Sequence, residues 1–301
     1  MTLIECIPNF SEGRRPEVVD AIAAAAKSVD GVSLLDVQSD PTHNRCVVTF
    51  VGHEEPIAEA AYRAVAKAAE LIDLNAHEGA HPRFGATDVC PFVPLRSDDM
   101  PACVETAQKL AKRVADELAI PAFLYEDAAR MPEHKNLAVV RGRGFEEMRD
   151  VIGSEPTKTP DEGAARVHPT AGAVAIGARF PLIAFNVNLD SDDLELARRI
   201  AVEIREKDGG MKCVKAIGLQ LEDGAAQVSM NLTDYRVTSP SDVVAAIGER
   251  AAAAGVAIRE SEVVGLLPQD VLVRLAQAAL HARDFGREQV LEARVLDTLL
   301  R

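Results

Sequence analysis

A chain of 301 residues is long for one domain, and two domains of about 150 residues each fit the usual size range. Hydrophobic residues make up 48% of the chain, which is enough for a sizeable core in each half. The formal net charge of −14 argues against general nucleic-acid binding, which needs a basic surface, and against attraction to anionic lipid. An anionic small substrate remains compatible with this charge, provided that arginine and histidine gather in a local pocket.

No export or membrane signal stands out. The N-terminus lacks a charged segment followed by an apolar run and a cleavage site. No stretch approaches the ~18 apolar residues that a membrane span needs. The five cysteines are scattered without a CxxC pair, which is typical of free thiols in a reducing compartment. We therefore expect a cytoplasmic protein.

The first half of the chain predicts the element order β-α-β-β-α-β-α-β. Strands are predicted at 2–7, 32–37 and 46–51, and Pro16 opens a helix at a position where proline is favoured. Apolar residues at helical spacing predict a long helix at 54–74. A loop without periodicity at 75–88 is followed by a strand at 89–95, a helix at 101–118 and a strand at 122–125.

The second half begins after a segment of linker composition. Residues 141–170 are rich in glycine, proline and charge, with room for one short helix at about 145–151. Strands are predicted at 173–176 and 182–189, and Ser191 is a suitable cap for a helix extending past residue 204. A hairpin at 214–219 and 226–232, a helix opened by Ser239 and Pro240, a strand at 256–264 and a helix at 269–282 complete the pattern.

The order β-α-β-β-α-β therefore occurs once in each half, which is the arrangement of ferredoxin-like folds. We predict an α/β (α+β) protein with two ferredoxin-like βαββαβ subdomains, comprising residues 1–178 and 179–301. A ligand cleft or tunnel between them is expected, because ligands favour domain junctions.

The string HEGAH at 77–81 matches the HExxH pattern of zinc metalloproteases. That pattern requires a helix, so that the two histidines share a face. Gly79 interrupts the segment, and Pro82 biases His81 away from helical geometry. We therefore predict no metal site, and a metal-dependent hydrolase using His77 and His81 is kept only as an alternative.

A second interpretation makes the same loop an active site centred on His81. Pro82 holds the histidine in extended geometry, and an imidazole with a pKa of about 6.5 suits general acid–base catalysis near neutral pH. Arg83 is suited to bind an anion, and Asp88 to orient the imidazole or hold a polar edge of a ligand. Gly85 adds to a density of Gly, Pro, His and Arg that favours an active site over the alternative, an ordinary surface loop.

Other polar candidates occur at strand ends. The segment 9–14, NFSEGR, follows the first strand, with a capping turn through Ser11 as the alternative. His43, Asn44 and Arg45 occupy the turn between two strands, with a polar hairpin tip as the alternative. The RGRG string at 141–144 is suited to an anion but lacks the Lys-Ser/Thr ending of a P-loop, so a linker is favoured.

Three asparagines interrupt apolar strands in the second half. An amide buried without partners is costly, so Asn186, Asn188 and Asn231 either pair across strands or face a ligand. The residues alone leave these two interpretations open.

Together these motifs make the chain similar to the glutamate formimidoyltransferase (formiminotransferase) family. The resemblance spans nearly the full length, and HPRFGATDVCPFVP is its most specific part. The matching strings, in the order of the family, are IECIPNFSEG, LLDV, HNR, TFVG, ELID, HEGAHPRFGATDVCPFVP, GAR, LIAFNVNL, KAIG, AQVSMNL and VVGLLP.

The resemblance implies two α/β subdomains with a ligand tunnel between them. It also implies transfer of the formimino group of N-formimino-L-glutamate to tetrahydrofolate in histidine degradation, giving 5-formimino-tetrahydrofolate and L-glutamate. The catalytic histidine of the family corresponds to His81. Tetrahydrofolate is then a co-substrate, no metal is required, the partners are small molecules, and a homodimer is one expected assembly.

Residues expected to bind the folate or the formimino donor come from both halves of the chain. The carboxylates of both substrates call for arginine partners, with Arg14, Arg45, Arg83 and Arg179 as candidates. The full set of expected binding residues is Asn9, Phe10, Asp36, His43, Asn44, Arg45, His77, Arg83, Gly85, Asp88, Arg179, Asn186, Asn188 and Asn231.

Two departures from the animal members of the family bear on these expectations. Animal members carry a second, cyclodeaminase domain, whereas this sequence stops at Arg301, so a stand-alone transferase is expected. Gln38 occupies the position of an acidic residue near the first hairpin, so either Asp36 or Asp40 is expected to replace it. A related enzyme acting on 5-formyl-tetrahydrofolate and a non-catalytic folate-binding paralogue remain alternatives.

Overall fold

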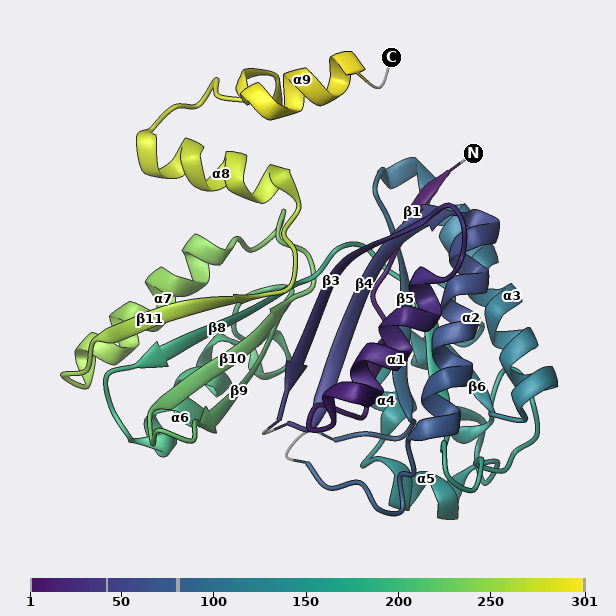
Figure 1. The fold of residues 1–301 in the computed structure, drawn as a ribbon. Helices are drawn as coiled ribbons and strands as arrows, with labels where there is room; N and C mark the ends of the chain where they lie inside the picture. The colour runs from purple at the N-terminus through teal and green to yellow at the C-terminus, as the bar shows by residue number, and fades with distance from the viewer. Residues whose placement is uncertain (1, 42, 80–81, 300–301) are drawn as a thin grey trace. The chain divides into compact units, whose positions relative to one another are not determined.

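The computed structural model describes residues 2–41, 43–79 and 82–299. The chain divides into two compact units, Met1–Phe180 and Pro181–Arg301, each with its own sheet and hydrophobic core (Figure 1). The expected boundary, after residue 178, lies two positions before this division. The predicted mixed α/β class is confirmed, since strands and helices alternate through both units.

The N-terminal unit is built on a seven-stranded sheet in the part of the chain described. Its strands are β1 (Leu3–Cys6), β2 (Asn9–Phe10), β3 (Val32–Asp40), β4 (Arg45–His53), β5 (Thr87–Pro94), β6 (Ala122–Glu126) and β7 (Val174–Ala178). Its α-helices are α1 (Pro16–Lys27), α2 (Glu54–Leu71), α3 (Met100–Leu118), α4 (Leu137–Arg141) and α5 (Phe145–Val151). Short 3-10 turns are η1 (Ser97–Asp99), η2 (Pro132–Lys135) and η3 (Pro156–Lys158).

Strands β1 and β2 form one interrupted strand between β4 and β5, and pair antiparallel with both. β3 pairs antiparallel with β4 at one edge, and β7 and β6 continue the sheet in parallel beyond β5. The sequence predicted only the first part of the interrupted strand. Pro8 causes the break because proline has no N–H for the ladder, yet its carbonyl still accepts from the Val48 N–H at 3.1 Å.

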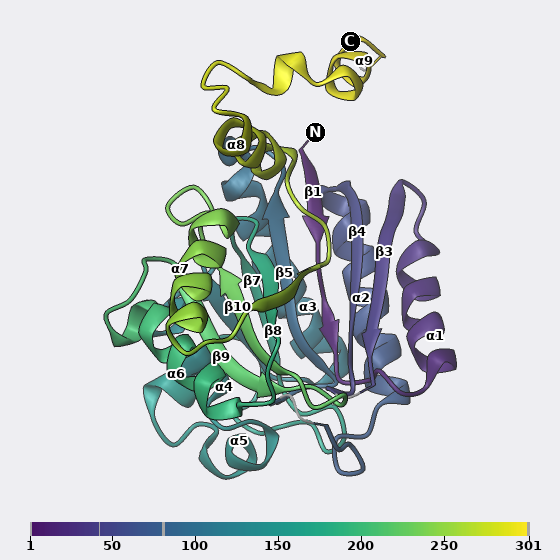
Figure 2. The same ribbon diagram turned by 90° about the vertical axis from the view of Figure 1, so that its left-hand side faces the viewer.

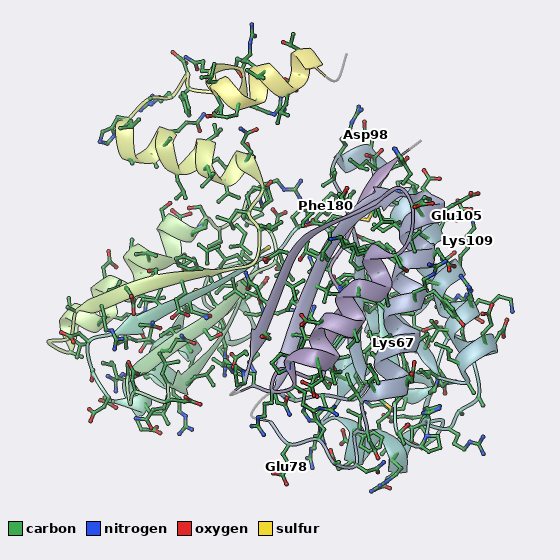
Figure 3. The ribbon with its side chains drawn as sticks, in the orientation of Figure 1. Lys67, Glu78, Asp98, Glu105, Lys109 and Phe180 are labelled. Carbon is green, nitrogen blue, oxygen red and sulfur yellow. The ribbon has the colours of Figure 1, made fainter. Side chains whose placement is uncertain are left out.

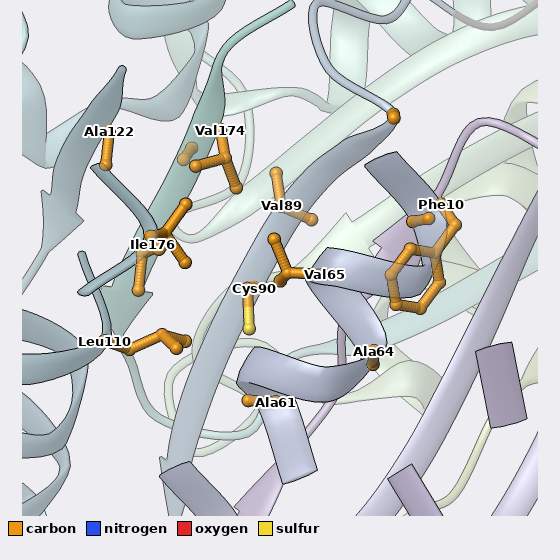
Figure 4. Close-up of a cluster of buried hydrophobic side chains, with 14 of the residues drawn as sticks. Phe10, Ala61, Ala64, Val65, Val89, Cys90, Leu110, Ala122, Val174 and Ile176 are labelled. Atoms are coloured by element: carbon orange, nitrogen blue, oxygen red, sulfur yellow. The ribbon is translucent and has the colours of Figure 1, made fainter. Parts of the chain in front are cut away.

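Helices α1, α2 and α3 cover one face of this sheet (Figures 1 and 2). Small alanines of α2 let the helix lie close to β5, where Val65 and Cys90 are buried in the same cluster (Figure 4). Every residue of β5 is buried. Successive strand residues point to opposite faces, so Asn9 and Arg45 point away from the side where their buried neighbours Phe10 and Cys46 join the core.

The segment after β6 is more structured than its composition suggests. Arg141 is the last residue of α4, so the linker interpretation is wrong for it. Helix α5 occupies the range predicted for a short helix, and Phe145 and Met148 bury one side of it. Gly142 and Gly144 have φ angles of 57° and 109°, which glycine adopts readily.

The C-terminal unit contains a four-stranded antiparallel sheet in the order β11-β8-β10-β9. Its strands are β8 (Ile183–Leu189), β9 (Val214–Gln220), β10 (Ala226–Leu232) and β11 (Ile258–Val264). Its helices are α6 (Leu194–Ile204), α7 (Pro240–Ala253), α8 (Gln269–Leu280) and α9 (Leu291–Leu299), with 3-10 turns η4 (Glu206–Asp208) and η5 (Arg287–Gln289).

Helices α6 and α7 supply the core on one face of this sheet. The predicted Ser239 cap of α7 is confirmed as a full capping box with Asp242. The cap of α6 is Asp193 rather than Ser191, because the Asp193 carboxylate accepts from the Leu196 N–H at 2.9 Å. Helix α9 was not predicted. None of the described helices is both long and apolar enough to cross a membrane.

Candidate active site

Asp88, near the start of β5, is the centre of a buried charged cluster in the N-terminal unit. The residue is 1% exposed. Its Oδ2 accepts from Arg141 Nη2 at 2.6 Å and from Arg45 Nη1 at 3.1 Å. Its Oδ1 accepts from the Phe84 N–H at 3.1 Å. Two guanidinium groups from different elements, β4 and α4, thus converge on one carboxylate.

Asn9 extends this cluster along the sheet. Its Oδ1 accepts from Arg45 Nη2 at 2.7 Å and Nε at 3.1 Å, and its Nδ2 donates to the carbonyl of Ile7 at 2.9 Å. Burial lowers the pKa of Arg45, an effect that the Asp88 carboxylate opposes and the Arg141 guanidinium reinforces. We call Asn9, Arg45, Asp88 and Arg141 the arginine cluster. It can present positive charge from a site that is largely shielded from water.

Asn44 joins three separate segments beside the arginine cluster. Its side chain accepts from the Gly13 N–H at 2.9 Å and donates to the carbonyl of Glu78 at 2.8 Å. The Glu78 side chain itself points outward (Figure 3). Asn44 has a φ of 49°, a left-handed conformation that asparagine tolerates. The neighbouring His43 pairs through Nδ1 with Asp40.

His77 is fixed on both ring nitrogens. Arg83 Nε donates to His77 Nδ1 at 3.1 Å, so Nδ1 is an acceptor and Nε2 carries the proton. That Nε2 lies 2.9 Å from the carbonyl of Asn44 and donates to it. The imidazole is therefore held from both sides and supports the loop.

Arg83 is engaged by protein groups rather than open to solvent. Its two terminal nitrogens donate to the Glu146 carboxylate at 2.9 and 2.8 Å, and Nη2 also donates to the His77 carbonyl at 3.2 Å. The hydrogen bond from Arg83 is the main cause that lowers the pKa of Glu146. In this structure Arg83 ties the loop to α5.

His81, the predicted catalytic residue, lies outside the described residues. The loop on either side of it is held by close backbone contacts. A Cβ added at Gly79 would lie 2.5 Å from the carbonyl oxygen of His43, so only glycine fits there. Residues 77–79 are not helical, so this part of the HEGAH string lacks the geometry of a helical zinc motif. Among the described residues, no group of three or more His, Cys, Asp or Glu could hold a metal ion.

The segment 9–14 packs against the loop before β5. Ser11 Oγ donates to the carbonyl of Gly85 at 2.7 Å, a contact across 74 residues rather than a local helix cap. A Cβ at Gly85 would lie 1.9 Å from the carbonyl oxygen of Ala173, so this position also requires glycine. Phe10, another predicted binding residue, is 0% exposed, and its side chain belongs to the core on the helix-covered face.

Two other candidates lie apart from the arginine cluster. Asp36 lies on the edge strand β3 and pairs with Thr49 of β4. The Arg179 N–H donates to the carbonyl of Phe92 at 3.1 Å. Phe92 is four residues along β5 from Asp88, so at strand spacing the two residues are about 13 Å apart. At that end, burial raises the pKa of Glu5, and the charge of Arg179 opposes the increase.

A second polar cluster occupies the C-terminal unit. Asn188 Nδ2 donates to Glu262 Oε1 at 2.9 Å, Asn186 Nδ2 to Glu262 Oε2 at 3.3 Å, and Gln227 Nε2 to Asn188 Oδ1 at 2.8 Å. Of the three predicted asparagines, the structure therefore brings Asn186 and Asn188 together. Asn231 is exposed and paired with Ala184 and Lys215 in the ladder.

Arg141, Gln227 and Glu262 were not predicted as site residues. Arg141 follows the apolar string LAVV, which could have indicated a helix presenting it. Glu262 lies in the edge strand β11 between Ser261 and Val263. Nothing in that sequence distinguishes it from an ordinary exposed glutamate.

Comparison with protein families decides what kind of protein carries these clusters. The N-terminal subdomain of the formiminotransferase domain matches residues 3–179, and the formiminotransferase domain matches residues 184–292. The chain belongs to the formiminotransferase family. The gap between the two matches includes the point where the compact units divide.

Formiminotransferase relatives match over almost the whole chain. A protein named glutamate formimidoyltransferase from Streptococcus pyogenes serotype M1 is 48% identical, with 98% of this chain and 99% of the relative covered. A protein of the same name from Thermoplasma acidophilum is 45% identical, with 98% of both chains covered. Formimidoyltransferase-cyclodeaminase of Rattus norvegicus is 42% identical over 91% of this chain but 52% of its own length.

Solved structures give no such support to the formiminotransferase assignment. A microcompartment protein from Desulfitobacterium hafniense covers 90% of this chain with a TM-score of 0.22 and 10% identity. A likeness at that level carries no argument.

Proposed function

We infer that this chain transfers the formimino group of N-formimino-L-glutamate to tetrahydrofolate, giving 5-formimino-tetrahydrofolate and L-glutamate. The activity is that of glutamate formimidoyltransferase, a one-carbon transferase of histidine degradation. The observation that carries this inference is the 48% identity to the S. pyogenes enzyme across 98% of the chain. Tetrahydrofolate is the co-substrate.

We place the reaction at the loop containing His81, beside the arginine cluster. The N5 amine of tetrahydrofolate attacks the amidine carbon of the donor and forms a tetrahedral adduct. His81 accepts the proton that N5 loses and returns it to the glutamate nitrogen as the carbon–nitrogen bond to glutamate breaks. General acid–base catalysis of this kind contributes roughly 10²–10⁴-fold, and holding both substrates together lowers the barrier further.

The arginine cluster is proposed to bind a substrate carboxylate. Arg141 Nε is buried and has no hydrogen-bond partner among the described residues. An unpaired buried donor is unfavourable by about 1–3 kcal/mol, so its retention needs an explanation. Binding an anion beside two guanidinium groups explains why an acidic protein can act on substrates that carry carboxylates.

The remaining expected site residues are proposed to act around these groups. The loop is shaped by His43 with Asp40, and by Asn44, His77, Arg83 and Gly85. In the C-terminal unit, Asn186 and Asn188 contact substrate. Asp36, Arg179 and Asn231 stay predictions as binding residues.

The ferredoxin-like description of each unit is also a proposal. It is supported by the C-terminal order β11-β8-β10-β9 and by the equivalent order β3-β4-β1-β5 within the larger N-terminal sheet. A ligand cleft between the subdomains, a homodimer and a cytoplasmic location remain predictions.

A direct assay tests the proposed function. Purified protein is mixed with tetrahydrofolate and N-formimino-L-glutamate, and release of glutamate is measured, with 5-formyl-tetrahydrofolate supplied separately as the competing substrate. We expect glutamate release only when both substrates of the proposed reaction are present. If folate binds but no glutamate is released, the chain is a folate-binding paralogue. Turnover of 5-formyl-tetrahydrofolate alone would favour the related formyl enzyme.

A further inference from the structure

Glu262 lies on the side of the C-terminal sheet opposite the core supplied by α6 and α7. Strand β8 alternates between the core residues Phe185, Val187 and Leu189 and the two asparagines 186 and 188. Because successive residues of a strand point to opposite faces, Asn186 and Asn188 share the other face. Glu262 pairs with Asn186 in the β11–β8 ladder, and Gln227 pairs with Asn188 in the β10–β8 ladder.

Amide donors from two neighbouring strands hold the Glu262 carboxylate. Oε1 accepts from Asn188 Nδ2 at 2.9 Å. Oε2 accepts from Asn186 Nδ2 at 3.3 Å and from Gln227 Nε2 at 3.4 Å. Gln227 also donates to Asn188 Oδ1 at 2.8 Å, which fixes the orientation of the Asn188 amide. Both carboxylate oxygens are thereby set in place by side chains that are themselves oriented.

This arrangement differs from an ordinary solvated sheet face. Asn188 is 1% exposed and Gln227 is 3% exposed, whereas Glu262 is exposed. Burying an amide is favourable only if its hydrogen bonds are made. Here the buried amides place one accessible carboxylate, which is the relation expected between supporting residues and a binding residue.

We propose that Glu262, held by Asn186, Asn188 and Gln227, binds the paired N–H donors of a planar N–C–N group of a substrate. A carboxylate accepts at roughly four lone-pair sites, so the three amide contacts leave one site free, on Oε1. On Oε2 the second N–H donor of the substrate takes the place of one of the two long amide contacts, at 3.3 and 3.4 Å. Two parallel N–H···O bonds to a planar partner combine strength with directional selectivity. The inference rests on the proposed function, since both substrates carry this chemistry. Tetrahydrofolate has it in its 2-amino-pyrimidinone edge, and the donor has it in its formimino group.

Glu260 provides a matched control on the same strand and the same face. It pairs with Asn188 in the ladder and accepts from Asn188 Nδ2 at 3.4 Å. It also contacts Arg259 Nε at 3.4 Å, and its side chain is 54% exposed. Glu260 thus has the charge of Glu262 without the set of amides that orients it.

The test compares Glu262→Gln with Glu260→Gln in the full chain. Binding of tetrahydrofolate is measured by calorimetry under reducing conditions, and the KM for N-formimino-L-glutamate is measured at saturating folate. We expect E262Q to weaken one of these at least tenfold, or about 1.4 kcal/mol, while E260Q changes both less than about twofold. A weaker folate Kd identifies the pyrimidinone edge as the bound group, and a higher KM for the donor identifies the formimino group.

The inference is overturned if E262Q matches E260Q in both measurements while its thermal unfolding is normal. If E262Q does not fold, the wild-type protein still gives a test with analogues. The inference is also overturned if two results occur together. The first is that 2-desamino-tetrahydrofolate binds less than twofold more weakly than tetrahydrofolate. The second is that glutamate and N-formimino-L-glutamate bind with equal affinity. Failure of the proposed function would show differently, as wild-type protein that releases no glutamate.

Discussion

At the scale of single residues, the arginine cluster shows what local pattern can and cannot predict. Asp88 and Arg45 were predicted because each lies in a dense polar motif. Their pairing was not predictable, because Asp88 is 43 residues from Arg45 and 53 residues from Arg141. Arg141 was assigned to a linker on the composition of RGRG. In the structure its side chain is 15% exposed and contacts Asp88, whereas that of Arg143 is 90% exposed.

Replacing Arg141 by Gln should therefore affect both stability and substrate binding. Asp88 loses its shorter ion-pair contact but keeps Arg45, so we expect the free energy of unfolding to fall by about 1–3 kcal/mol. The KM for the substrate whose carboxylate is bound should rise at least tenfold. Chemical denaturation and steady-state kinetics measure the two effects, with Arg143→Gln as the exposed control. Equal behaviour of the two variants would remove Arg141 from the site.

His81→Ala tests the catalytic assignment. We expect turnover to fall by roughly 10²–10⁴-fold, because the proton acceptor for N5 and the donor for the leaving nitrogen are lost. Folate affinity and thermal stability should stay near those of the wild type, since the change removes a proton-transfer group. Single-turnover kinetics with saturating substrates give the chemical rate, and a rate close to wild type would sink the assignment.

His134 predicts a pH-dependent contribution to stability that is separate from the site. The residue is 1% exposed, with Nδ1 3.3 Å from Asp161 Oδ2 and Nε2 3.1 Å from the carbonyl of Thr157. The bond to Asp161 is the main cause that raises the pKa of His134 above its ordinary 6.5. A raised folded-state pKa means that the stabilisation is complete below pH 6.5 and is lost as pH rises through the folded value.

His134→Gln should therefore flatten this part of the pH profile. Urea denaturation at intervals from about pH 6 to about pH 8.5 begins below the unfolded pKa and follows the stability as the pH rises. We expect the stability difference between wild type and variant to be largest at the acidic end and to shrink with rising pH. A difference that grows with pH would contradict the assigned direction.

At the scale of elements, the spacing of apolar residues predicted the helices that pack on the sheets. Ile57, Ala61, Ala64 and Ala68 are buried along α2, as helical periodicity requires. Strand β2 was missed because Pro8 ends the visible strand pattern, although pairing resumes at Asn9. Helix α9 was missed too. It is an amphipathic segment in which Leu291 is 72% exposed.

The close backbone approaches around β5 were likewise not visible in sequence, since they depend on distant carbonyls. Gly85→Ala should be strongly destabilising, because its Cβ would lie 1.9 Å from the Ala173 carbonyl oxygen. We expect a loss of more than about 2 kcal/mol, typical of overpacking and displaced backbone. Gly248→Ala in α7 is the control, since its Cβ would meet Ile258 Cδ1 at an ordinary 3.6 Å. That helical change should stabilise by about 0.5–1 kcal/mol, and thermal unfolding of both variants decides the comparison.

At the scale of the whole molecule, the net charge of −14 opposes the approach of substrates that carry carboxylates. The arginine cluster acts at short range and is largely shielded from water, whereas repulsion from the acidic surface acts at long range. Salt screens exposed charges separated by more than about 10 Å at 0.1 M and screens buried pairs much less. Added salt should therefore reduce the repulsion more than it weakens binding at the cluster.

We accordingly expect kcat/KM for tetrahydrofolate to stay level or rise as ionic strength increases from about 0.02 to about 0.3 M. Arg141→Gln should lower kcat/KM throughout without changing the direction of this trend, because the long-range field is almost the same. Initial rates at limiting folate, with potassium chloride varied and pH fixed, measure both proteins. A steep fall with salt in the wild type would mean that an exposed basic surface attracts the folate, and the arginine cluster would then not be what allows this acidic protein to bind its anionic substrate.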